Sequence, residues 1–145
     1  MKLIEILKEK LLSLLFGKTR INKVVIEKTL LENIMKFAKV NHPNEFIAFL
    51  GGRINKDELV LTNLLYQQYF PSTDSVFTRI NLPMTAQSFG TVHSHPIPSN
   101  KPSKQDLFLF GKQGMVHMII KYPYRLGDIA VYNFKGERIN FKIKE

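Results

Sequence analysis

Two histidines and one aspartate lie close together in the chain and have the types and spacing of a metal site. His93 and His95 are separated by one residue, Ser94, at the end of a short apolar segment, residues 90–94, that is typical of a strand. Because side chains alternate along a strand, both imidazoles would point to the same side. Asp106 follows a loop rich in proline and serine. Zinc binds neutral imidazole nitrogens and carboxylate oxygens at about 2.0–2.2 Å, and three such ligands leave a fourth position for water, as in catalytic sites.

Asp106 also has an ordinary structural explanation. If a helix begins at Ser103, Asp106 falls in its first turn, where the two side chains would form a capping box near the positive end of the helix dipole. A His-x-His pair alone is equally ambiguous, because one inward and one surface histidine occur together by chance. Taken singly, these residues leave both interpretations open.

The wider segment resembles the JAMM (MPN+) metalloprotease family. The motif of that family is His-x-His-Pro, a seven-residue spacer counted from the second histidine, and then Ser-x-x-Asp. Residues 96–102 supply the spacer, and the fixed positions are matched by His93, His95, Pro96, Ser103 and Asp106. The resemblance spans about residues 22–134. It implies one zinc ion held by the two histidines and the aspartate.

The family also carries a glutamate on an upstream strand, in a segment that typically reads Glu-x-x-Gly-x-Leu-x-Gly. Residues 45–52 resemble this segment, with Ala48 where glycine is usual. By this resemblance Glu45 is the acid/base of amide hydrolysis, and Ser103 hydrogen-bonds the oxyanion of the tetrahedral intermediate. Glu45 also heads an otherwise apolar strand, where a charge without a partner is costly.

The resemblance implies an enzyme that hydrolyses amide bonds. The first interpretation is a peptidase or isopeptidase that removes a ubiquitin-like modifier, or acts on its conjugates, after the C-terminal Gly-Gly. The second keeps the chemistry but trims a C-terminal extension from a sulfur-carrier protein. A third, from a different class, is a non-catalytic MPN-type scaffold, which the complete ligand set disfavours. The small domain without long insertions is similar to the prokaryotic members of the family.

The elements that must position these residues are short. Helical stripes of apolar residues cover residues 2–16 and a second stretch ending near Val40, and a helix is predicted from Ser103 to about Lys112. The strand candidates are residues 24–26, 45–50, 58–66, 76–80, 90–94, 115–121, 129–134 and 138–144. This pattern predicts an α/β (α+β) fold, with a mixed, largely antiparallel sheet flanked by two or three helices.

Two segments are predicted in the chain: an N-terminal amphipathic helix extension, residues 1–20, and a JAMM/MPN-like domain, residues 21–145. The apolar stripe of the extension includes Leu3, Leu7 and Leu11. We expect this stripe to pack on its own domain or on a sister subunit, which would give a homodimer. Membrane binding is disfavoured, because Glu5 and Glu9 interrupt the basic face.

The amino-acid composition excludes several classes of site and partner. The chain of 145 residues has no cysteine, which excludes disulfides, all-Cys zinc sites and a cysteine nucleophile. The formal net charge of +9 is dispersed and favours acidic partners in general, but no basic-aromatic motif indicates nucleic-acid binding. Neither a signal peptide nor a membrane span is apparent, so a cytoplasmic protein is expected. We assign ordinary structural or surface positions to the other polar candidates: His42, Asp74, Arg79, His117 and Asp128.

Overall fold

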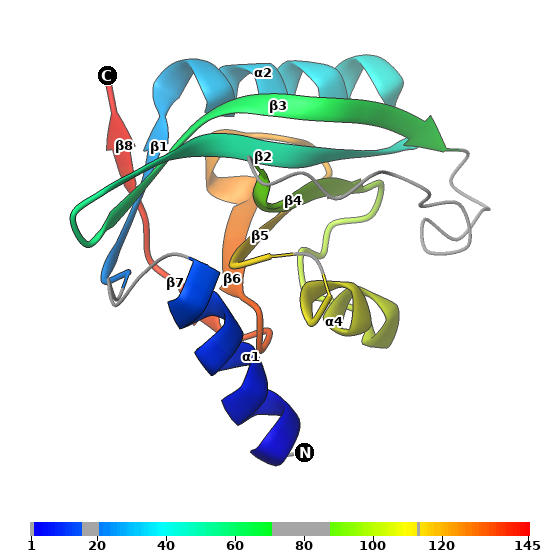
Figure 1. The fold of residues 1–145 in the computed structure, drawn as a ribbon. Coiled ribbons are helices and arrows are strands. Elements are labelled where there is room, and N and C mark those ends of the chain that lie inside the picture. Colours follow the sequence, from blue (N-terminus) through cyan, green and yellow to red (C-terminus); the bar gives the residue numbers. More distant parts are fainter. Residues whose placement is uncertain (1, 16–20, 71–87, 113) are drawn as a thin grey trace.

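The computed structural model describes residues 2–15, 21–70, 88–112 and 114–145, and it is built around one eight-stranded mixed sheet (Figure 1). The strand order is β7-β6-β5-β4-β2-β3-β1-β8. The elements in chain order are α1 (Lys2–Leu15), β1 (Lys23–Glu27), α2 (Lys28–Asn41), β2 (Glu45–Asn55), β3 (Glu58–Phe70), β4 (Ser88–His95), α4 (Lys104–Phe110), β5 (Val116–Lys121), the 3-10 turn η1 (Leu126–Asp128), β6 (Ile129–Asn133), β7 (Arg138–Ile139) and β8 (Lys142–Lys144).

The sheet is mixed, as the sequence predicts. Strand β4 lies at its centre and pairs with β2 in the antiparallel sense and with β5 in the parallel sense. The long hairpin β2–β3 supplies the largest antiparallel ladder, and Lys56 takes the left-handed conformation at its turn, with φ of 58°. Strand β1 pairs in parallel with both β3 and β8. The predicted fold class is therefore confirmed.

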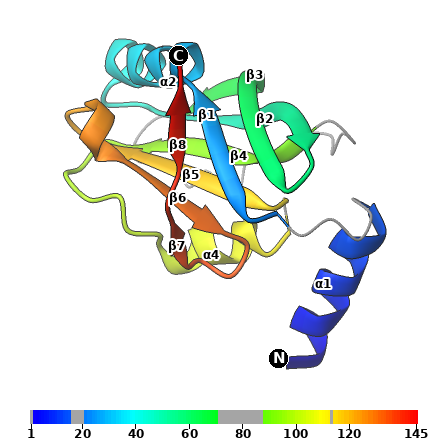
Figure 2. The ribbon, with the colours of Figure 1, turned by 90° about the vertical axis from the view of Figure 1, so that its left-hand side faces the viewer.

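The C-terminal segment differs from the prediction of one strand over residues 138–144. It divides into β7, which pairs with β6, and β8, which pairs with β1 at the opposite edge of the sheet. Figure 2 shows this segment in red, passing across the open side of the curved sheet from β6 to β1. Long-range pairing of this kind is not visible in local periodicity. The predicted strand at residues 76–80 lies outside the described residues.

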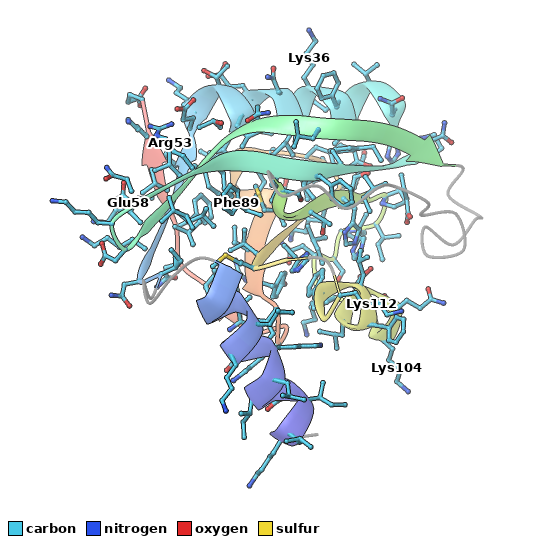
Figure 3. All side chains as sticks on the ribbon, in the orientation of Figure 1. Lys36, Arg53, Glu58, Phe89, Lys104 and Lys112 are labelled. Atoms are coloured by element: carbon cyan, nitrogen blue, oxygen red, sulfur yellow. The ribbon has the colours of Figure 1, made fainter. Side chains whose placement is uncertain are left out.

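Two helices cover opposite faces of the sheet. Helix α2 buries Leu30, Leu31, Ile34 and Ala38 in the main core, because these residues recur on one face of the helix. Helix α4 buries Phe110 in a second cluster with Ile119, Ala130 and Tyr132. Exposed lysines lie on the outer sides of both helices, Lys36 on α2 and Lys104 on α4 (Figure 3). The candidate ligands His93, His95 and Asp106 lie on the face of the sheet that α4 covers.

Helix α1 stands apart from the sheet (Figures 1 and 2). Five of its apolar side chains are 50–68% exposed, namely Leu3, Ile4, Ile6, Leu7 and Leu11. The expectation that this stripe packs on its own domain is therefore wrong for these residues, and the expectation of a sister subunit stays a prediction. Within the described part of the chain, no helix is both long and apolar enough to cross a bilayer.

Candidate metal centre

Strand β4 brings both histidines to the α4 side of the sheet. Val92 belongs to the α2-side core, so the alternating side chains of His93 and His95 point the other way. The strand begins with a very close approach to β5, since a Cβ on Gly90 would lie 1.5 Å from the Val116 carbonyl oxygen. Only glycine fits there, and this contact fixes the register that pairs His93 with Ile119.

Helix α4 brings Asp106 to the same place. Ser103 is the N-cap: its Oγ accepts a hydrogen bond of 3.0 Å from the Asp106 amide, and Asp106 Oδ2 accepts one of 2.8 Å from the Ser103 amide. This is the predicted capping box. The same aspartate is buried and also contacts both imidazoles. The two interpretations of Asp106, helix cap and partner of the histidines, are therefore both correct in geometry.

Three potential ligand atoms converge at this point. His93 Nε2 lies 3.1 Å from Asp106 Oδ1, His95 Nε2 lies 3.2 Å from Asp106 Oδ2, and the two Nε2 atoms are 3.1 Å apart. One ligand atom from each residue lies within 4.8 Å of the others. Ligands at about 2.05 Å in a tetrahedral shell are separated by about 3.3 Å, so the observed spacing fits zinc closely.

The hydrogen bonding of His95 also fits a metal ligand. Its Nδ1 lies 2.9 Å from the Ser99 carbonyl oxygen, which can only accept. Nδ1 therefore carries the hydrogen, and in the neutral ring the lone pair of Nε2 points toward His93 and Asp106. Metal-binding histidines are commonly oriented in this way by a carbonyl on the opposite nitrogen. The residues present thus fit a divalent metal of the zinc type.

The charges of the centre reinforce each other. Burial alone would raise the pKa of Asp106, but hydrogen bonds from His93 and His95 outweigh it and hold that pKa well below its usual range. Burial alone would lower the pKa of His95, but the Asp106 carboxylate and the Ser99 carbonyl outweigh it and raise the pKa above the usual value. The cluster therefore favours positive charge opposite the Asp106 carboxylate, and a metal cation would meet the same field.

Glu45 lies beside this cluster at the start of β2. Ile47 pairs with His93, and extending that register by two residues places Glu45 opposite His95. The Phe46 amide donates a 2.9 Å hydrogen bond to Ser94 Oγ, which fixes the neighbouring backbone. Burial raises the pKa of Glu45, opposed by the nearby His93 and His95. A half-buried carboxyl with a raised pKa beside a metal centre has the character of a general acid/base.

The structure places the predicted residues in one cluster and adds others that the sequence did not indicate. Ser99 orients His95 through a backbone carbonyl, which leaves no signal in the residue type. Ser94, between the two histidines, binds the strand that carries Glu45. Asp128 was expected in an ordinary surface or turn position; it lies in the turn η1 and is buried, with its carboxylate hydrogen-bonded by the Arg125 amide and side chain. The predicted surface residues Asp74 and Arg79 lie outside the described residues.

His117 is a buried histidine beneath the centre. It stacks on Phe110 at a centroid distance of 4.3 Å, and its Nδ1 lies 2.7 Å from Thr91 Oγ1. Burial lowers the pKa of His117 from its usual value of 6.5 to about 3. The ring is therefore neutral in the folded protein and takes a structural position, in agreement with the sequence analysis.

This burial predicts a loss of stability in acid. Between pH 6.5 and about 3 the unfolded state binds a proton at His117 that the folded state excludes, so the free energy of unfolding falls as pH falls, by at most about 1.4 kcal/mol per pH unit. His117→Gln keeps a partner for Thr91 but does not titrate, so its stability should depend less steeply on pH. Urea unfolding at pH 7, 5.5 and 4.5, with chelator present, measures both slopes. Parallel slopes would contradict the prediction.

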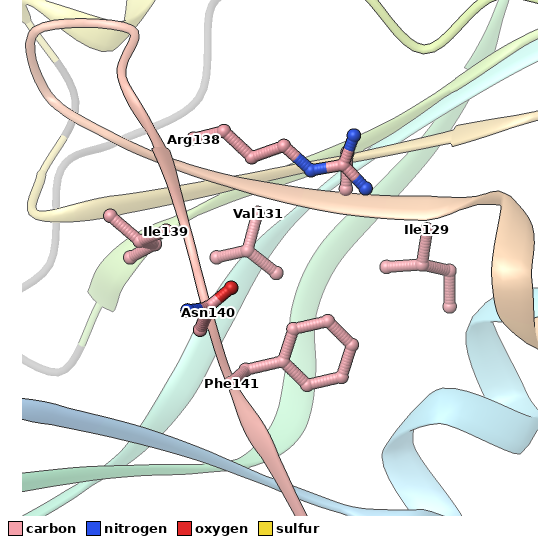
Figure 4. Close-up of a pocket in the computed structure, with 7 residues that line it drawn as sticks. Ile129, Val131, Arg138, Ile139, Asn140 and Phe141 are labelled. Atoms are coloured by element: carbon pink, nitrogen blue, oxygen red, sulfur yellow. The ribbon is translucent and has the colours of Figure 1, made fainter.

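Two cavities lie away from this centre, on the side of the C-terminal segment. One of about 240 Å³ lies between β6 and the C-terminal segment and is lined by residues 129–131 and 138–141, with Arg138 across it (Figure 4). A second, of about 520 Å³, adjoins it and reaches Val24 in β1 and Ile21 just before that strand. Neither of these two cavities is lined by a residue of the cluster around His93.

Comparison with known proteins gives a consistent result. The family model for prokaryotic homologs of the JAB domain matches residues 27–132. A protein of Haloferax volcanii named "Probable metalloprotease" is 34% identical over 104 residues, which are 66% of this chain and 64% of that protein. The chain thus corresponds to somewhat less than two thirds of the length of that relative.

Solved structures show the same relationship. One, reported as "JAMM: A Metalloprotease-like Zinc Site in the Proteasome and Signalosome", is 38% identical with a TM-score of 0.67 and covers 86% of this chain and 100% of its own. A JAB1/MPN domain protein from Archaeoglobus fulgidus is 35% identical with a TM-score of 0.66, covering 86% and 99%. A protein from Desulfitobacterium hafniense, at 22% identity and a TM-score of 0.56 over 84% and 93%, shares the fold.

Proposed function

The chain is a small prokaryotic member of the JAMM/MPN family, and on that premise we propose that it is a zinc-dependent peptidase or isopeptidase. His93, His95 and Asp106 would hold one zinc ion. The observation that carries the proposal is the convergence of three ligand atoms within 4.8 Å beside a glutamate with a raised pKa. A protein-interaction scaffold has no need of this arrangement.

The protein residues divide the remaining work. When bound, zinc would lower the pKa of a water molecule toward neutrality and polarise the substrate carbonyl. Glu45 would accept a proton from the water that attacks the carbonyl carbon and would later donate it to the departing amine. Its raised pKa suits both tasks, because a carboxyl that titrates closer to neutrality returns a proton more readily.

Ser103 would stabilise the negative oxygen of the tetrahedral intermediate. Its oxygen accepts from the Asp106 amide in the capping box, so its O–H hydrogen can be donated to a substrate. Ser103→Ala is expected to lower kcat about 10- to 1000-fold with little change in KM. Ser103→Thr keeps the hydroxyl and should retain most activity. Equal activity in the alanine variant, measured well below its melting temperature, would remove Ser103 from the mechanism.

We propose a ubiquitin-like modifier as the substrate, cut after its C-terminal Gly-Gly. A glycine pair carries no side chains and can lie close to a buried centre. The net charge of +9 would favour an acidic modifier in the initial encounter. Trimming of a C-terminal extension from a sulfur-carrier protein is the alternative, because the chemistry at the cleaved bond is the same.

The test compares two substrates and three enzyme samples. One substrate is a ubiquitin-like protein joined through Gly-Gly to a lysine side chain, and the other carries a linear extension after Gly-Gly. Zinc-loaded wild type, chelator-treated wild type and zinc-loaded Glu45→Gln are compared by mass spectrometry. Cleavage by the first sample alone supports the proposal. Preference for the lysine-linked substrate indicates removal of a modifier, and preference for the linear one indicates trimming of a C-terminal extension. No cleavage of either substrate by the zinc-loaded protein would contradict it.

We also propose that helix α1 joins two copies of the chain. Ile4, Leu7 and Leu11 are spaced by three and four residues, as in a coiled-coil seam, and all are at least half exposed in one protomer. Burial of a side chain of this size contributes roughly 1.5–3 kcal/mol, so a helix pair would cover the stripe favourably. This makes the sister subunit the better of the two expected packing partners.

Deletion of residues 1–20 is therefore expected to convert a dimer into a monomer. Leu7→Glu should do the same with the helix still present, because it places a charge in the seam. Light scattering coupled to size-exclusion chromatography measures the mass, and Glu5→Gln on the outer side of the helix is the control. A wild-type protein that remains monomeric at all concentrations would contradict this proposal.

A further inference from the structure

A loop after β5 contacts two parts of the candidate active site: the end of the strand that carries His95 and the turn that precedes Glu45. The loop contains Tyr122, Pro123 and Tyr124, and its Tyr122 amide lies 3.0 Å from the His95 carbonyl oxygen and 3.2 Å from that of Ile97. It is therefore bound directly to the end of the strand that carries the metal ligands. The three loop residues Tyr122, Pro123 and Tyr124 lie outside the motif at residues 93–106.

The same loop also binds the turn that leads to Glu45. The Tyr124 hydroxyl forms a 2.7 Å hydrogen bond with His42 Nδ1, across 82 residues of sequence. The His42 ring stacks on Tyr122 with centroids 4.8 Å apart and meets Tyr124 edge-on at 5.5 Å. His42 lies three residues before Glu45, at the end of α2. The loop thus contacts the backbone of His95 and the side chain of His42, three residues before Glu45.

Tyr124 holds its position at a conformational cost. It is 2% exposed and has φ of 67°, a left-handed conformation that is unfavourable for a bulky side chain by roughly 1–2 kcal/mol. Such a conformation persists only where surrounding contacts enforce it, and these outliers cluster at functional sites. Burial, with a smaller effect from the charge of Glu45, raises the pKa of Tyr124 to about 12, so the phenol stays protonated.

We propose that Tyr124 and His42 form a positioning pair that fixes Glu45 relative to the metal ligands. The inference rests on the proposed metallopeptidase function. Neither residue is proposed to touch the reacting atoms. Their hydrogen bond links the β5 loop, anchored to His95, with the turn that precedes Glu45. Loosening it would let Glu45 shift while the metal ligands stay in place, and small displacements of a catalytic group are costly in rate.

The test uses two variants that remove the hydrogen bond from opposite sides. Tyr124→Phe and His42→Phe both keep an aromatic ring for packing and lose the polar contact. Each is expected to lower kcat between about 3- and 100-fold with KM and zinc content unchanged. The double variant should be no slower than the worse single variant, because both substitutions remove one shared interaction. Tyr122→Phe, which keeps the ring stack and the backbone bonds, is the matched control.

Hydrogen exchange gives a readout that does not depend on activity. Amides at residues 44–46 should exchange faster in Tyr124→Phe than in Tyr122→Phe, while those of helix α4 should not change. The proposal of a positioning pair is overturned if kcat and exchange in Tyr124→Phe match those in Tyr122→Phe. It is also overturned if the losses of kcat in the two single variants multiply in the double variant, or if zinc content falls together with kcat. If wild type cleaves nothing, the proposed function fails, and the exchange data alone decide whether the pair holds Glu45.

Discussion

Glu45→Gln is expected to lower turnover by about 10²- to 10⁴-fold while the zinc content stays at the wild-type level. Glutamine has nearly the same shape but cannot accept and return a proton. Glu45 lies beside the ligand cluster without belonging to the three residues whose ligand atoms converge. Metal binding and catalysis should therefore separate cleanly in this variant.

The pH dependence gives a second readout for the same residue. Because burial raises the pKa of Glu45, activity should fall, as pH decreases, at a higher pH than an ordinary carboxyl would give. The residual activity of the glutamine variant should not show this fall at low pH. Single-turnover rates and zinc content are measured across the same pH range, so that loss of metal in acid is recognised.

A matched control for Glu45 is available in the same hairpin. Glu58 is the first residue of β3, as Glu45 is of β2, and it is similarly half-buried. It lies at the other end of the hairpin, remote from helix α4 (Figure 3). Glu58→Gln should leave turnover unchanged. Full activity in Glu45→Gln would exclude Glu45 as the acid/base.

Asp106→Asn is expected to weaken zinc binding by more than about 100-fold and to abolish activity at limiting zinc. Residues that hydrogen-bond the ligands of a metal already contribute about 10- to 100-fold to its affinity, and a ligand itself should contribute more. Asparagine can still accept the hydrogen bond from the Ser103 amide, so the helix cap survives. The substitution therefore tests the ligand role separately from the capping role. Zinc content after dialysis, and activity as a function of added zinc, measure the effect.

Asp128 provides the control for a buried aspartate. Like Asp106, it is the N3 residue of a capping box, three residues after the N-cap, and is almost fully buried, but it belongs to the 3-10 turn before β6. Asp128→Asn should lower stability without changing zinc affinity. Normal zinc occupancy in Asp106→Asn would refute the ligand assignment. An equal loss of zinc in both variants would show that general destabilisation is responsible.

The candidate centre could be predicted well because its signals are local. Period-two geometry puts His93 and His95 on one side, and a helix start puts Asp106 within reach of them. The structure brings the three side chains together and confirms the mixed sheet. Features that depend on contacts between distant segments could not be predicted from the sequence. The division into β7 and β8, and the contact of His42 with Tyr124, arise from pairing across the fold and leave no periodic trace.

The two contacts of Asp106 have a consequence for the rate of metal exchange. Its carboxylate both starts helix α4 and faces the histidines, and α4 has only seven residues. Short helices fray readily at their ends. Opening of the first turn would withdraw one ligand and the cap together, so the residence time of the metal should follow the lifetime of that turn. Substitutions that lengthen this lifetime, at exposed sites such as Gln105, should slow zinc dissociation without altering any ligand.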